Sequence, residues 1–338
     1  MSRAEGDDSG KPLRWGILGP GRIAPRLVRA VRASRRGELV AVASRDTDRA
    51  AAFAAHHGIR RSLGSYDALL SLPDVDVVYV SLPNHLHAEW AVRALEAGKH
   101  VLCEKPLALA VDDVDAIAQA AERNGRICAE AFMYLHHPQI LRAVEMARGG
   151  VLGQLELVNG SFSFFLASGG DPRADRAMGG GSLWDVGCYP VSLARRIAGV
   201  EPDRVSAFAR FDAGGIDRTF IGQLHFPGDL LAQFDSGFAA PDRERIEIVG
   251  SDATLVLDTP FVPEPDGLPP SVTLWRGRRS TAIDVPSLDQ YGAEVEDLTA
   301  AILDGTPPRV GLDFSRGNCA TLMQLDAAAS SQAASHLD

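Results

Sequence analysis

Short apolar runs alternate with amphipathic stretches along the first 131 residues of the chain. The apolar runs have the length and composition of buried strands, and they lie at 14–18, 39–44, 75–81, 100–103 and 126–131. The stretches between them repeat apolar residues at helical spacing, at 22–33, 46–57, 85–97 and 111–123. Such alternation requires right-handed crossovers and gives a parallel sheet with helices on both faces. This half is therefore predicted to be a doubly wound α/β domain.

The second half has a different pattern, in which longer runs of strand character follow one another. They lie at 155–166, 204–211, 219–226, 230–238 and 245–249, with turns rich in Gly, Asp and Pro between them. Helical spacing returns at 139–148, 184–198 and 294–303, and the proline-rich stretch 259–270 is expected to be a surface loop. Consecutive strands after an α/β unit predict an α+β domain with a large, mostly antiparallel open sheet. We expect two domains, at 12–131 and 132–338.

Composition and charge narrow the classes of function. The chain has 338 residues, and 34 basic minus 44 acidic side chains give a net charge of −10. An acidic chain is a poor general binder of nucleic acid, and no stretch has the roughly 20 apolar residues that span a bilayer. Residues 1–11 form a polar tail without the apolar core of a signal peptide, so we expect a cytoplasmic protein. The four cysteines are far apart and lack C-x-x-C spacing, so we expect reduced thiols and no bound metal.

The strongest local signal directly follows the first predicted strand and opens the first predicted helix; it is Gly19-Pro20-Gly21-Arg22-Ile23-Ala24. Its glycines permit a tight turn and let the backbone approach a pyrophosphate, which the positive end of the helix stabilises. A G-x-G-x-x-A pattern alone is weak evidence, but the strand–turn–helix context favours a dinucleotide over an ordinary glycine turn. The residues expected to bind it are Gly19, Gly21, Arg22, Ile23 and Ala24, with Arg22 as a second candidate for contact with phosphate.

The end of the second predicted strand indicates which dinucleotide is bound. An acidic residue there would hold the ribose 2′-hydroxyl of NAD, whereas this chain has Ser44-Arg45 followed by Asp46. Serine can donate a hydrogen bond to a 2′-phosphate and arginine can bind it as a charged fork, so NADP is favoured, with NAD possible. The alternative is that Arg45 is a solvated residue at a helix start and Asp46 only its cap. Three arginines further along the first predicted helix are expected on its solvent-exposed face: Arg26, Arg29 and Arg36.

Polar residues follow two later strands of the predicted parallel sheet. Leu82, Pro83, Asn84 and His87 come after the run at 75–81, and Glu104 and Lys105 come at the end of the run at 100–103. Ligands of open α/β sheets lie beyond the carboxyl ends of the strands, so we expect these residues to bind the nicotinamide end of the cofactor. A place on the helix surface fits His87 equally well. A lysine fixed by a following proline at the end of a strand points more strongly to a function.

A third candidate segment runs from Gly179 to Tyr189, with three consecutive glycines before a predicted helix. The glycines let the chain approach a ligand closely. Asp185 and Tyr189 are four residues apart, so on a helix they share one face. A tyrosine near a lysine ammonium has a lowered pKa, which suits proton transfer. From spacing alone, a buried, hydrogen-bonded core tyrosine fits Tyr189 better than an acid–base catalyst does.

Together these motifs resemble the glucose–fructose oxidoreductase/inositol dehydrogenase (Gfo/Idh/MocA) family in order and spacing. Tyr189 in place of a histidine, together with the segment 130–134 (EAFMY), is similar to the branch of NADP-linked D-xylose dehydrogenases and dimeric dihydrodiol dehydrogenases. The resemblance implies a Rossmann domain, then an open sheet that often pairs subunits. It also implies Lys105 and Tyr189 as catalytic residues, with Asp185 supporting the substrate or the tyrosine.

Two residues depart from that branch. Leu135 stands where the branch usually has an arginine, and this leaves the substrate preference open. His136 follows it, and we expect either a substrate contact or a hydrophilic loop residue at that position.

The sequence predicts an NADP(H)-dependent oxidoreductase that transfers hydride between the nicotinamide and a secondary alcohol or hemiacetal of a sugar-like molecule. A trans-dihydrodiol or cyclic polyol is the alternative substrate. From another class, the chain could be a non-catalytic NADP-binding regulatory protein, but a pure binder needs neither Lys105 nor Tyr189.

The strands between Thr219 and Phe238 indicate how copies of the chain form an oligomer. Apolar residues lie on both of their faces, at Ile221, Leu224, Phe226, Leu231 and Phe234. No later helix is expected to cover the outer face, and an exposed apolar face of that size marks a subunit interface. We expect a homodimer or homotetramer through the open sheet.

The coenzyme prediction is tested by changing Arg45 to Asp. The Arg45→Asp variant should weaken NADP binding by about 1.5–3 kcal/mol, because a charge-assisted contact to the 2′-phosphate is lost, and should weaken NAD binding far less. Titration of both coenzymes against both proteins measures the difference. An equal loss for the two coenzymes, or no loss, contradicts a role for Arg45 in reading the phosphate.

Overall fold

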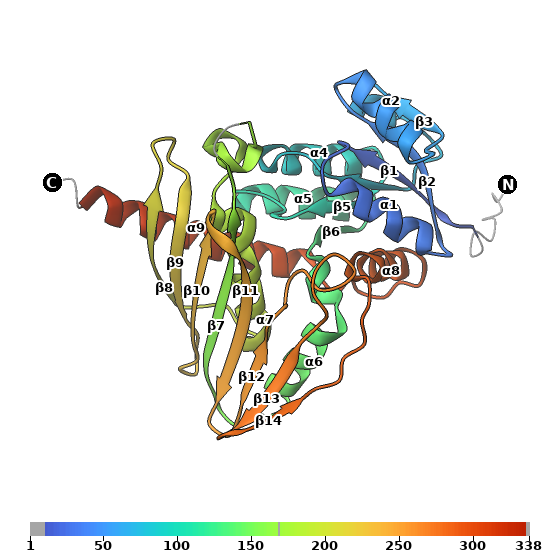
Figure 1. The fold of residues 1–338 in the computed structure, drawn as a ribbon. Helices are drawn as coiled ribbons and strands as arrows, with labels where there is room; N and C mark the ends of the chain where they lie inside the picture. The colour runs from blue at the N-terminus through green and yellow to red at the C-terminus, as the bar shows by residue number, and fades with distance from the viewer. Residues whose placement is uncertain (1–10, 168–169, 336–338) are drawn as a thin grey trace.

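Two sheets form the frame of the molecule in the computed structural model, which describes residues 11–167 and 170–335 (Figure 1). The first has six strands in the order β3-β2-β1-β4-β5-β6, and the second has eight in the order β14-β13-β12-β11-β7-β10-β9-β8. The predicted α/β half and α+β half are therefore confirmed. Almost all of the tail expected at residues 1–11 lies outside the described residues.

The first sheet is parallel throughout. Its strands are β1 (Leu13–Leu18), β2 (Gly37–Ala43), β3 (Arg61–Leu63), β4 (Val77–Val80), β5 (His100–Glu104) and β6 (Cys128–Ala131). Its helices are α1 (Ala24–Ala33), α2 (Thr47–His56), α3 (Tyr66–Leu70), α4 (His87–Glu96) and α5 (Val111–Asn124), with a 3₁₀ turn η1 (Asn84–Leu86) before α4. All the predicted strands and helices are present, whereas β3 and α3 were not predicted.

The second sheet is antiparallel except for the pair β7 and β10. Its strands are β7 (Leu155–Phe165), β8 (Arg204–Phe211), β9 (Asp217–His225), β10 (Leu231–Gly237), β11 (Ala239–Gly250), β12 (Thr254–Leu257), β13 (Val272–Arg276) and β14 (Arg279–Ala282). The helices of this half are α6 (Pro138–Arg148), α7 (Cys188–Ala198), α8 (Gln290–Leu303) and α9 (Leu312–Ser335). Shorter helical turns are η2 (Met133–His136), η3 (Pro172–Ala174), η4 (Arg176–Met178) and the π-helix η5 (Leu183–Gly187). Within the described ranges, no helix is long and apolar enough to cross a membrane.

One face of the second sheet is covered and the other is open. The long helix α9 and helix α7 pack on the covered face, so Leu224, Phe226 and Phe234 are buried. These three residues thus lie on the covered face, and the face expected to stay uncovered is the opposite one. Ile221 and Leu231 lie on the opposite face and remain about half exposed. The apolar residues on one face therefore belong to the core, whereas those on the other face are partly exposed to solvent.

The proline-rich stretch between β12 and β13 is only partly the expected surface loop. Its first residues, Thr259 to Phe261, are buried. The side-chain amide of Gln139 donates to the Thr259 carbonyl at 2.7 Å, and that of Gln290 donates to the Phe261 carbonyl at 3.1 Å. These bonds hold the Phe261 ring in the interior, next to the site described below.

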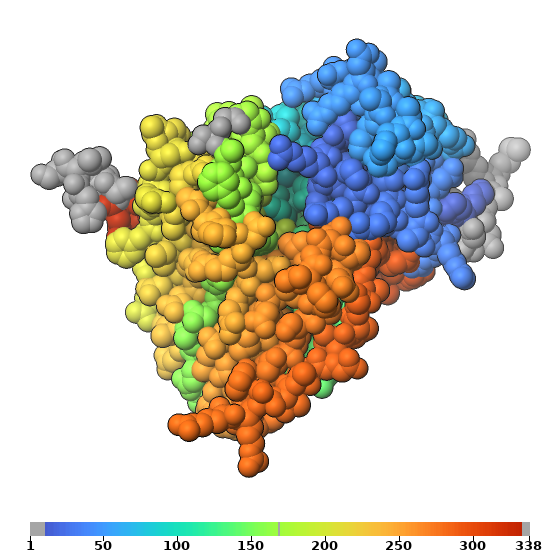
Figure 2. Space-filling view, in the orientation of Figure 1, coloured from blue at the N-terminus to red at the C-terminus, as the bar shows by residue number. Residues whose placement is uncertain are grey.

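The arginines of α1 do not face solvent alone, which corrects the expectation for Arg26, Arg29 and Arg36. Arg29 pairs with both Asp266 and Asp289 at 2.8 Å, and Arg36 pairs with Asp304 at 2.7 Å. These acids lie on α8 or beside it, and Figure 2 shows the N-terminal part of the chain resting on this C-terminal segment. The two halves are therefore joined along α1 by ion pairs.

The end of β6 holds the loop that follows β5. Glu130 is buried, and its Oε1 accepts a hydrogen bond from the backbone N–H of Leu107 at 2.9 Å. Burial raises the pKa of Glu130 to about 7, against the effect of its hydrogen bonds. A carboxylate of the unfolded chain titrates about two to three pH units lower.

A Glu130→Gln variant should change how stability depends on pH. Between about pH 4.5 and 7 the folded wild type holds a proton that the unfolded chain has lost, so its stability falls as the pH rises through this window. The fall should be of the order of 3 kcal/mol relative to Glu130→Gln and should level off above pH 7. Denaturant unfolding at several pH values measures it, with Glu145→Gln as an exposed control. Parallel pH profiles for wild type and Glu130→Gln contradict a buried, titrating Glu130.

Candidate active site

The glycine turn after β1 has the shape of a phosphate-binding loop. Gly19 has a φ of 87°, and a Cβ there would lie 2.8 Å from the carbonyl oxygen of Ser81 and 2.7 Å from the Leu82 side chain. Helix α1 starts at Ala24 without a side-chain cap and without an acidic residue in its first turn. Pro25 has no N–H, and the N–H groups of Ala24 and Arg26 donate to the carbonyls of Gly21 and Ile23. The positive end of the helix and the close approach that the glycine turn permits would therefore hold an anion here, which fits the predicted role of Gly19, Gly21, Ile23 and Ala24.

The end of β2 lies beside this turn. Ser44 is buried, and its Oγ accepts a hydrogen bond from the Asp46 N–H at 3.2 Å, while the Arg45 side chain is exposed. The Asp46 carboxylate accepts from the Arg49 N–H at 3.0 Å, so Asp46 caps α2 as the alternative interpretation proposed. Arg49 was not predicted, although it follows Arg45 by one helical turn. Its Nη2 donates to the carbonyl of Pro20 in the glycine turn at 2.9 Å.

The loops after β4 and β5 are fastened together by His87. The ring is buried, with Nδ1 2.8 Å from the Pro106 carbonyl and Nε2 2.8 Å from the Leu82 carbonyl. This corrects the idea that His87 lies on a helix surface. Burial lowers the pKa of His87, although both carbonyls favour the charged ring. Asn84 links the loop after β4 to the glycine segment, because its side-chain amide donates to the carbonyl of Gly179 at 2.9 Å.

Lys105 and Asp185 meet at the carboxyl end of β5. The Lys105 Nζ donates to Asp185 Oδ1 at 2.9 Å and to the Asp185 backbone carbonyl at 2.6 Å. Burial alone would lower the pKa of Lys105, but the carboxylate of Asp185 and other nearby groups raise it above its ordinary value. Nζ also lies 5.2 Å from the centroid of the Tyr189 ring. The three residues predicted as catalytic are therefore together.

Glu104 points away from this group. It accepts a hydrogen bond from the hydroxyl of Tyr79, and burial raises its pKa. The Glu104 side chain is therefore held by Tyr79, on the neighbouring strand β4.

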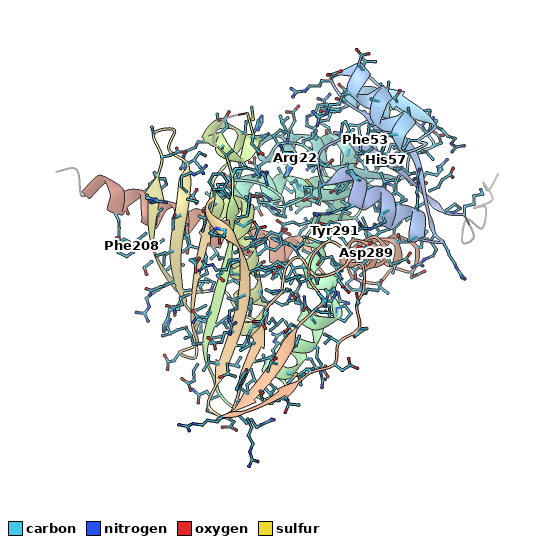
Figure 3. The ribbon with its side chains drawn as sticks, in the orientation of Figure 1. Arg22, Phe53, His57, Phe208, Asp289 and Tyr291 are labelled. Carbon is cyan, nitrogen blue, oxygen red and sulfur yellow. The ribbon has the colours of Figure 1, made fainter. Side chains whose placement is uncertain are left out.

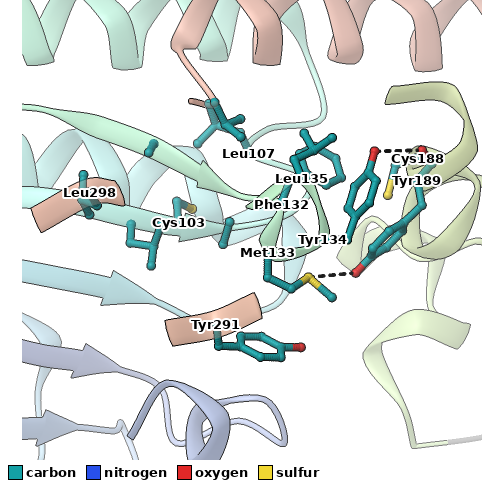
Figure 4. Packing of buried hydrophobic residues seen from close by; sticks show 14 of the residues in the cluster. Cys103, Leu107, Phe132, Met133, Tyr134, Leu135, Cys188, Tyr189, Tyr291 and Leu298 are labelled. Atoms are coloured by element: carbon teal, nitrogen blue, oxygen red, sulfur yellow. Dashed lines mark hydrogen bonds between the residues drawn. The ribbon is translucent and has the colours of Figure 1, made fainter. Parts of the chain in front are cut away.

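Four aromatic rings lie close to Tyr189, and Figure 4 shows one of them, Tyr134, beside it. Its neighbours have ring centroids between 5.2 and 5.9 Å away, and they are Phe132, Tyr134, Phe162 and Phe261. Among the residues that the structure describes, the Tyr189 hydroxyl contacts only the Met133 sulfur, at the long distance of 3.7 Å. Burial raises the pKa of Tyr189 well above its usual value, so the lowering expected from a neighbouring ammonium is wrong. The phenol keeps its proton and has no strong acceptor for it.

A buried carboxylate that the sequence did not reveal shapes the glycine segment. Asp217, at the start of β9, accepts hydrogen bonds from Ser182 Oγ and the Leu183 N–H, both at 2.7 Å. Gly181 has a φ of 125°, and a Cβ there would lie 2.1 Å from Asp217 Oδ1. Asp217 thereby fixes the start of η5, the element that carries Asp185. Burial raises its pKa to about 6.

The two departures from the family branch are both buried. Leu135 belongs to the hydrophobic core. The His136 ring faces α8, with Nδ1 4.0 Å from Asp297 Oδ2, and burial lowers its pKa to about 3. His136 is therefore not a hydrophilic loop residue.

Comparison with known proteins gives consistent matches over most of the chain. Residues 13–132 match the model of the oxidoreductase family with an NAD-binding Rossmann fold, and residues 140–256 match the GFO/IDH/MocA C-terminal domain. An NADP⁺-dependent D-xylose 1-dehydrogenase from Haloferax volcanii is 37% identical over 96% of this chain and 100% of its own length. A trans-1,2-dihydrobenzene-1,2-diol dehydrogenase from Danio rerio is 33% identical over 72% of this chain and 73% of its own.

A solved structure has the same fold over nearly its whole length. A 3-ketoreductase from Actinomadura kijaniata, in complex with NADP and TDP-benzene, superimposes with a TM-score of 0.89 and 32% identity, covering 94% of this chain and 98% of that one. The family resemblance, the fold class and the prediction of a nicotinamide-dinucleotide oxidoreductase are thereby confirmed. The chain belongs to the Gfo/Idh/MocA oxidoreductase family.

Proposed function

We propose that the protein is an NADP-dependent oxidoreductase that transfers hydride between the nicotinamide and a secondary alcohol or carbonyl of a sugar-like substrate. The observation that carries this proposal is the ammonium of Lys105, held by Asp185 against the ring of Tyr189 at the carboxyl end of β5. Ligands of open α/β sheets lie at that edge. Membership in an oxidoreductase family favours an enzyme over the alternative of a non-catalytic binding protein.

The coenzyme would lie along the carboxyl edge of the first sheet, and residues at both ends of this edge would hold it. The glycine turn from Gly19 and the start of α1 would take the diphosphate, and Ser44, Arg45 and Arg49 would take a 2′-phosphate. The relatives that use NADP support this preference over NAD. The loop from Leu82 to Asn84, fastened by His87, would lie against the nicotinamide.

The bound nicotinamide supplies or accepts the hydride, and the side chains handle the proton. Because Tyr189 keeps its proton, its hydroxyl can donate to the oxygen of a carbonyl substrate during reduction. In oxidation the same oxygen takes the proton of the substrate hydroxyl, and the nearby Lys105 ammonium stabilises the phenolate that forms. Asp185 keeps Lys105 charged and in place.

Sugars and keto-sugars come first as the substrate class, and cyclic polyols or dihydrodiols remain the alternative. The D-xylose dehydrogenase acts on a sugar by its name, and the dihydrodiol dehydrogenase acts on a cyclic diol. The aromatic rings around Tyr189 favour a substrate with an apolar ring face. A panel of sugars, polyols and dihydrodiols, assayed with NADP and NAD by nicotinamide absorbance, distinguishes them.

We also propose what each half of the chain does and in which cell compartment the protein works. Residues 12–131 would bind the dinucleotide, and residues 132–338 would bind substrate and form the oligomer. The first sheet lies within the former and the second within the latter, while α8 and α9 pack back on α1 and α5. A cytoplasmic location would keep the four buried, free cysteines reduced.

The oligomer would form through the open face of the second sheet. Strand register puts four large apolar residues on this face, each between 40% and 59% exposed: Phe208, Ile221, Leu231 and Trp275. Phe208 lies on the edge strand β8 (Figure 3). Polar residues lie between them on the same face, among them Gln223, Asp235 and Arg245, so the contact would combine apolar anchors with polar surroundings, as subunit interfaces do.

The catalytic assignment is tested with Tyr189→Phe, Lys105→Met and the double variant. Tyr189→Phe should fold and bind NADPH as the wild type does, and turnover should fall by roughly 10²–10⁴, the range for lost acid–base help. Lys105→Met should lose a similar amount. The double variant should be little worse than either, because the two groups act as one unit.

The matched control is Tyr134→Phe in the same aromatic cluster. The Tyr134 hydroxyl faces Ser192 Oγ at 2.7 Å, so its loss should lower the melting temperature but leave turnover per folded molecule within about threefold. If Tyr189→Phe behaves like this control, with full turnover and reduced stability, Tyr189 is a core tyrosine and the mechanism is wrong.

The oligomer is tested by light scattering at micromolar concentration. We expect the mass of a dimer or tetramer for the wild type, and a lower mass for Ile221→Asp, because a charge at the centre of an apolar interface is costly to desolvate. Val200→Asp is the control, since Val200 is equally exposed but lies after α7, outside the sheet. A monomeric mass for the wild type ends the proposal.

A further inference from the structure

A row of alternating charges runs from the catalytic lysine to the glycine turn. It starts with Lys105 Nζ, which lies 2.9 Å from Asp185 Oδ1. The other oxygen of Asp185 is 3.8 Å from Arg173 Nη1. Arg173 then binds Asp171 through two bonds, from Nε to Oδ1 at 3.0 Å and from Nη2 to Oδ2 at 2.8 Å. The row ends where Asp171 Oδ2 meets Arg22 Nη1 at 3.1 Å.

The last link joins the two halves of the molecule. Arg22 belongs to the turn after β1, and Asp171 precedes η3, which follows β7. The Asp171 side chain is only 11% exposed, and its two oxygens are fixed by Arg173. Those hydrogen bonds lower the pKa of Asp171 to about 2, so it is an anion at every physiological pH. It is thus a rigid, charged acceptor aimed at the glycine turn.

Arg22 retains free binding capacity at this position. Its side chain is 85% exposed, and among the described residues Asp171 is its only ion-pair partner. The pair uses Nη1 alone, so the other nitrogens of the guanidinium fork remain able to bind a second anion. The nearest place for such an anion is the start of α1, next to which Arg22 stands in the chain.

We propose that Asp171 and Arg173 are part of the coenzyme site, as a strap from the second half that Arg22 holds closed over the diphosphate of the bound dinucleotide. Arg22 then lies between two anions, the diphosphate and Asp171, and binds both. Arg173 anchors the strap on the same carboxylate that holds Lys105. The proposal rests on the proposed dinucleotide function and extends it, because it makes release of the coenzyme depend on a contact between the halves.

A strap of this kind acts on the rate of coenzyme release. Opening it breaks one exposed ion pair, which contributes little to the folding of the chain. The pair nevertheless has to open before the diphosphate can leave. Removing this ion pair should therefore change the dissociation rate of the coenzyme, since substitutions at one interface change mostly the dissociation rate.

Stopped-flow release of NADPH from the full-length protein tests the strap. Asp171→Asn removes the charge at nearly constant shape, and we expect release to become about 3- to 10-fold faster while association changes less than twofold. Arg22→Gln should also speed release, because Arg22 binds both anions. The double variant should release NADPH no faster than Arg22→Gln alone, since both changes break the same link.

Asp175→Asn is the matched control. Asp175 lies in the same segment and accepts a hydrogen bond from the Ala177 N–H, which asparagine can also accept. It has no ion pair with any residue in the described part of the chain. Its release rate should equal that of the wild type. Asp171→Glu, which keeps the charge, should restore slow release and distinguishes loss of the link from misfolding.

The outcomes separate this proposal from the one on which it rests. Wild-type release in Asp171→Asn, additive effects in the double variant, or equal acceleration in Asp175→Asn overturns the strap while leaving NADP binding intact. Failure of the wild type to bind NADPH overturns the proposed coenzyme, and the strap with it.

Discussion

The site depends on a single buried positive charge, the ammonium of Lys105. Moving an ammonium out of water costs several kcal/mol, and only a close carboxylate and well-placed acceptors offset that cost. Asp185 supplies both, through its side chain and its backbone carbonyl. The two residues are 80 positions apart and come from different halves. Any arrangement of the halves that separated them would leave a buried charge unpaired, so this contact determines which part of the second half lies over the carboxyl edge of the first sheet.

The parts of the fold that could be predicted are those in which burial leaves a continuous pattern. Strands buried on both faces, such as β4 (Val77–Val80), are apolar runs that the sequence shows directly. The short strand β3 (Arg61–Leu63) has partly exposed side chains, and the edge strand β14 (Arg279–Ala282) is exposed and polar, so neither leaves such a run. The first half of β11 was missed for the same reason. These strands are specified by their neighbours in the sheet and not by a local signal. The strands β12 (Thr254–Leu257) and β13 (Val272–Arg276) were also missed, although they contain buried apolar residues, because each is short.

The motifs of the site could be predicted separately, but their partners could not. Lys105 and Asp185 were both expected at the site because each belongs to a local motif. Asp217 and Asp171 carry no such signal among 44 acidic residues, and Asp171 meets Arg22 across 149 positions. A charged helix face has the same sequence pattern whether it faces water or packs against acidic residues of the other half of the chain. This is why the arginines of α1 were expected to face solvent. The pKa of Tyr189 was misjudged because the rings that bury it come from distant segments.

Along the row of charges from Lys105 to Arg22, four side chains are at most one-third exposed, Asp171 among them at 11%, and only the outermost, Arg22, is largely exposed. The Lys105 and Asp185 side chains are 13% and 14% exposed, Arg173 is 33% exposed, and Arg22 is 85% exposed. Electrostatic attraction weakens with exposure, because water and salt screen it. The outer link is therefore the first to open and the inner link the last. Contacts between domains are commonly polar and allow movement, so the exposed link to Arg22 can open while the buried pair keeps the lysine beside its carboxylate.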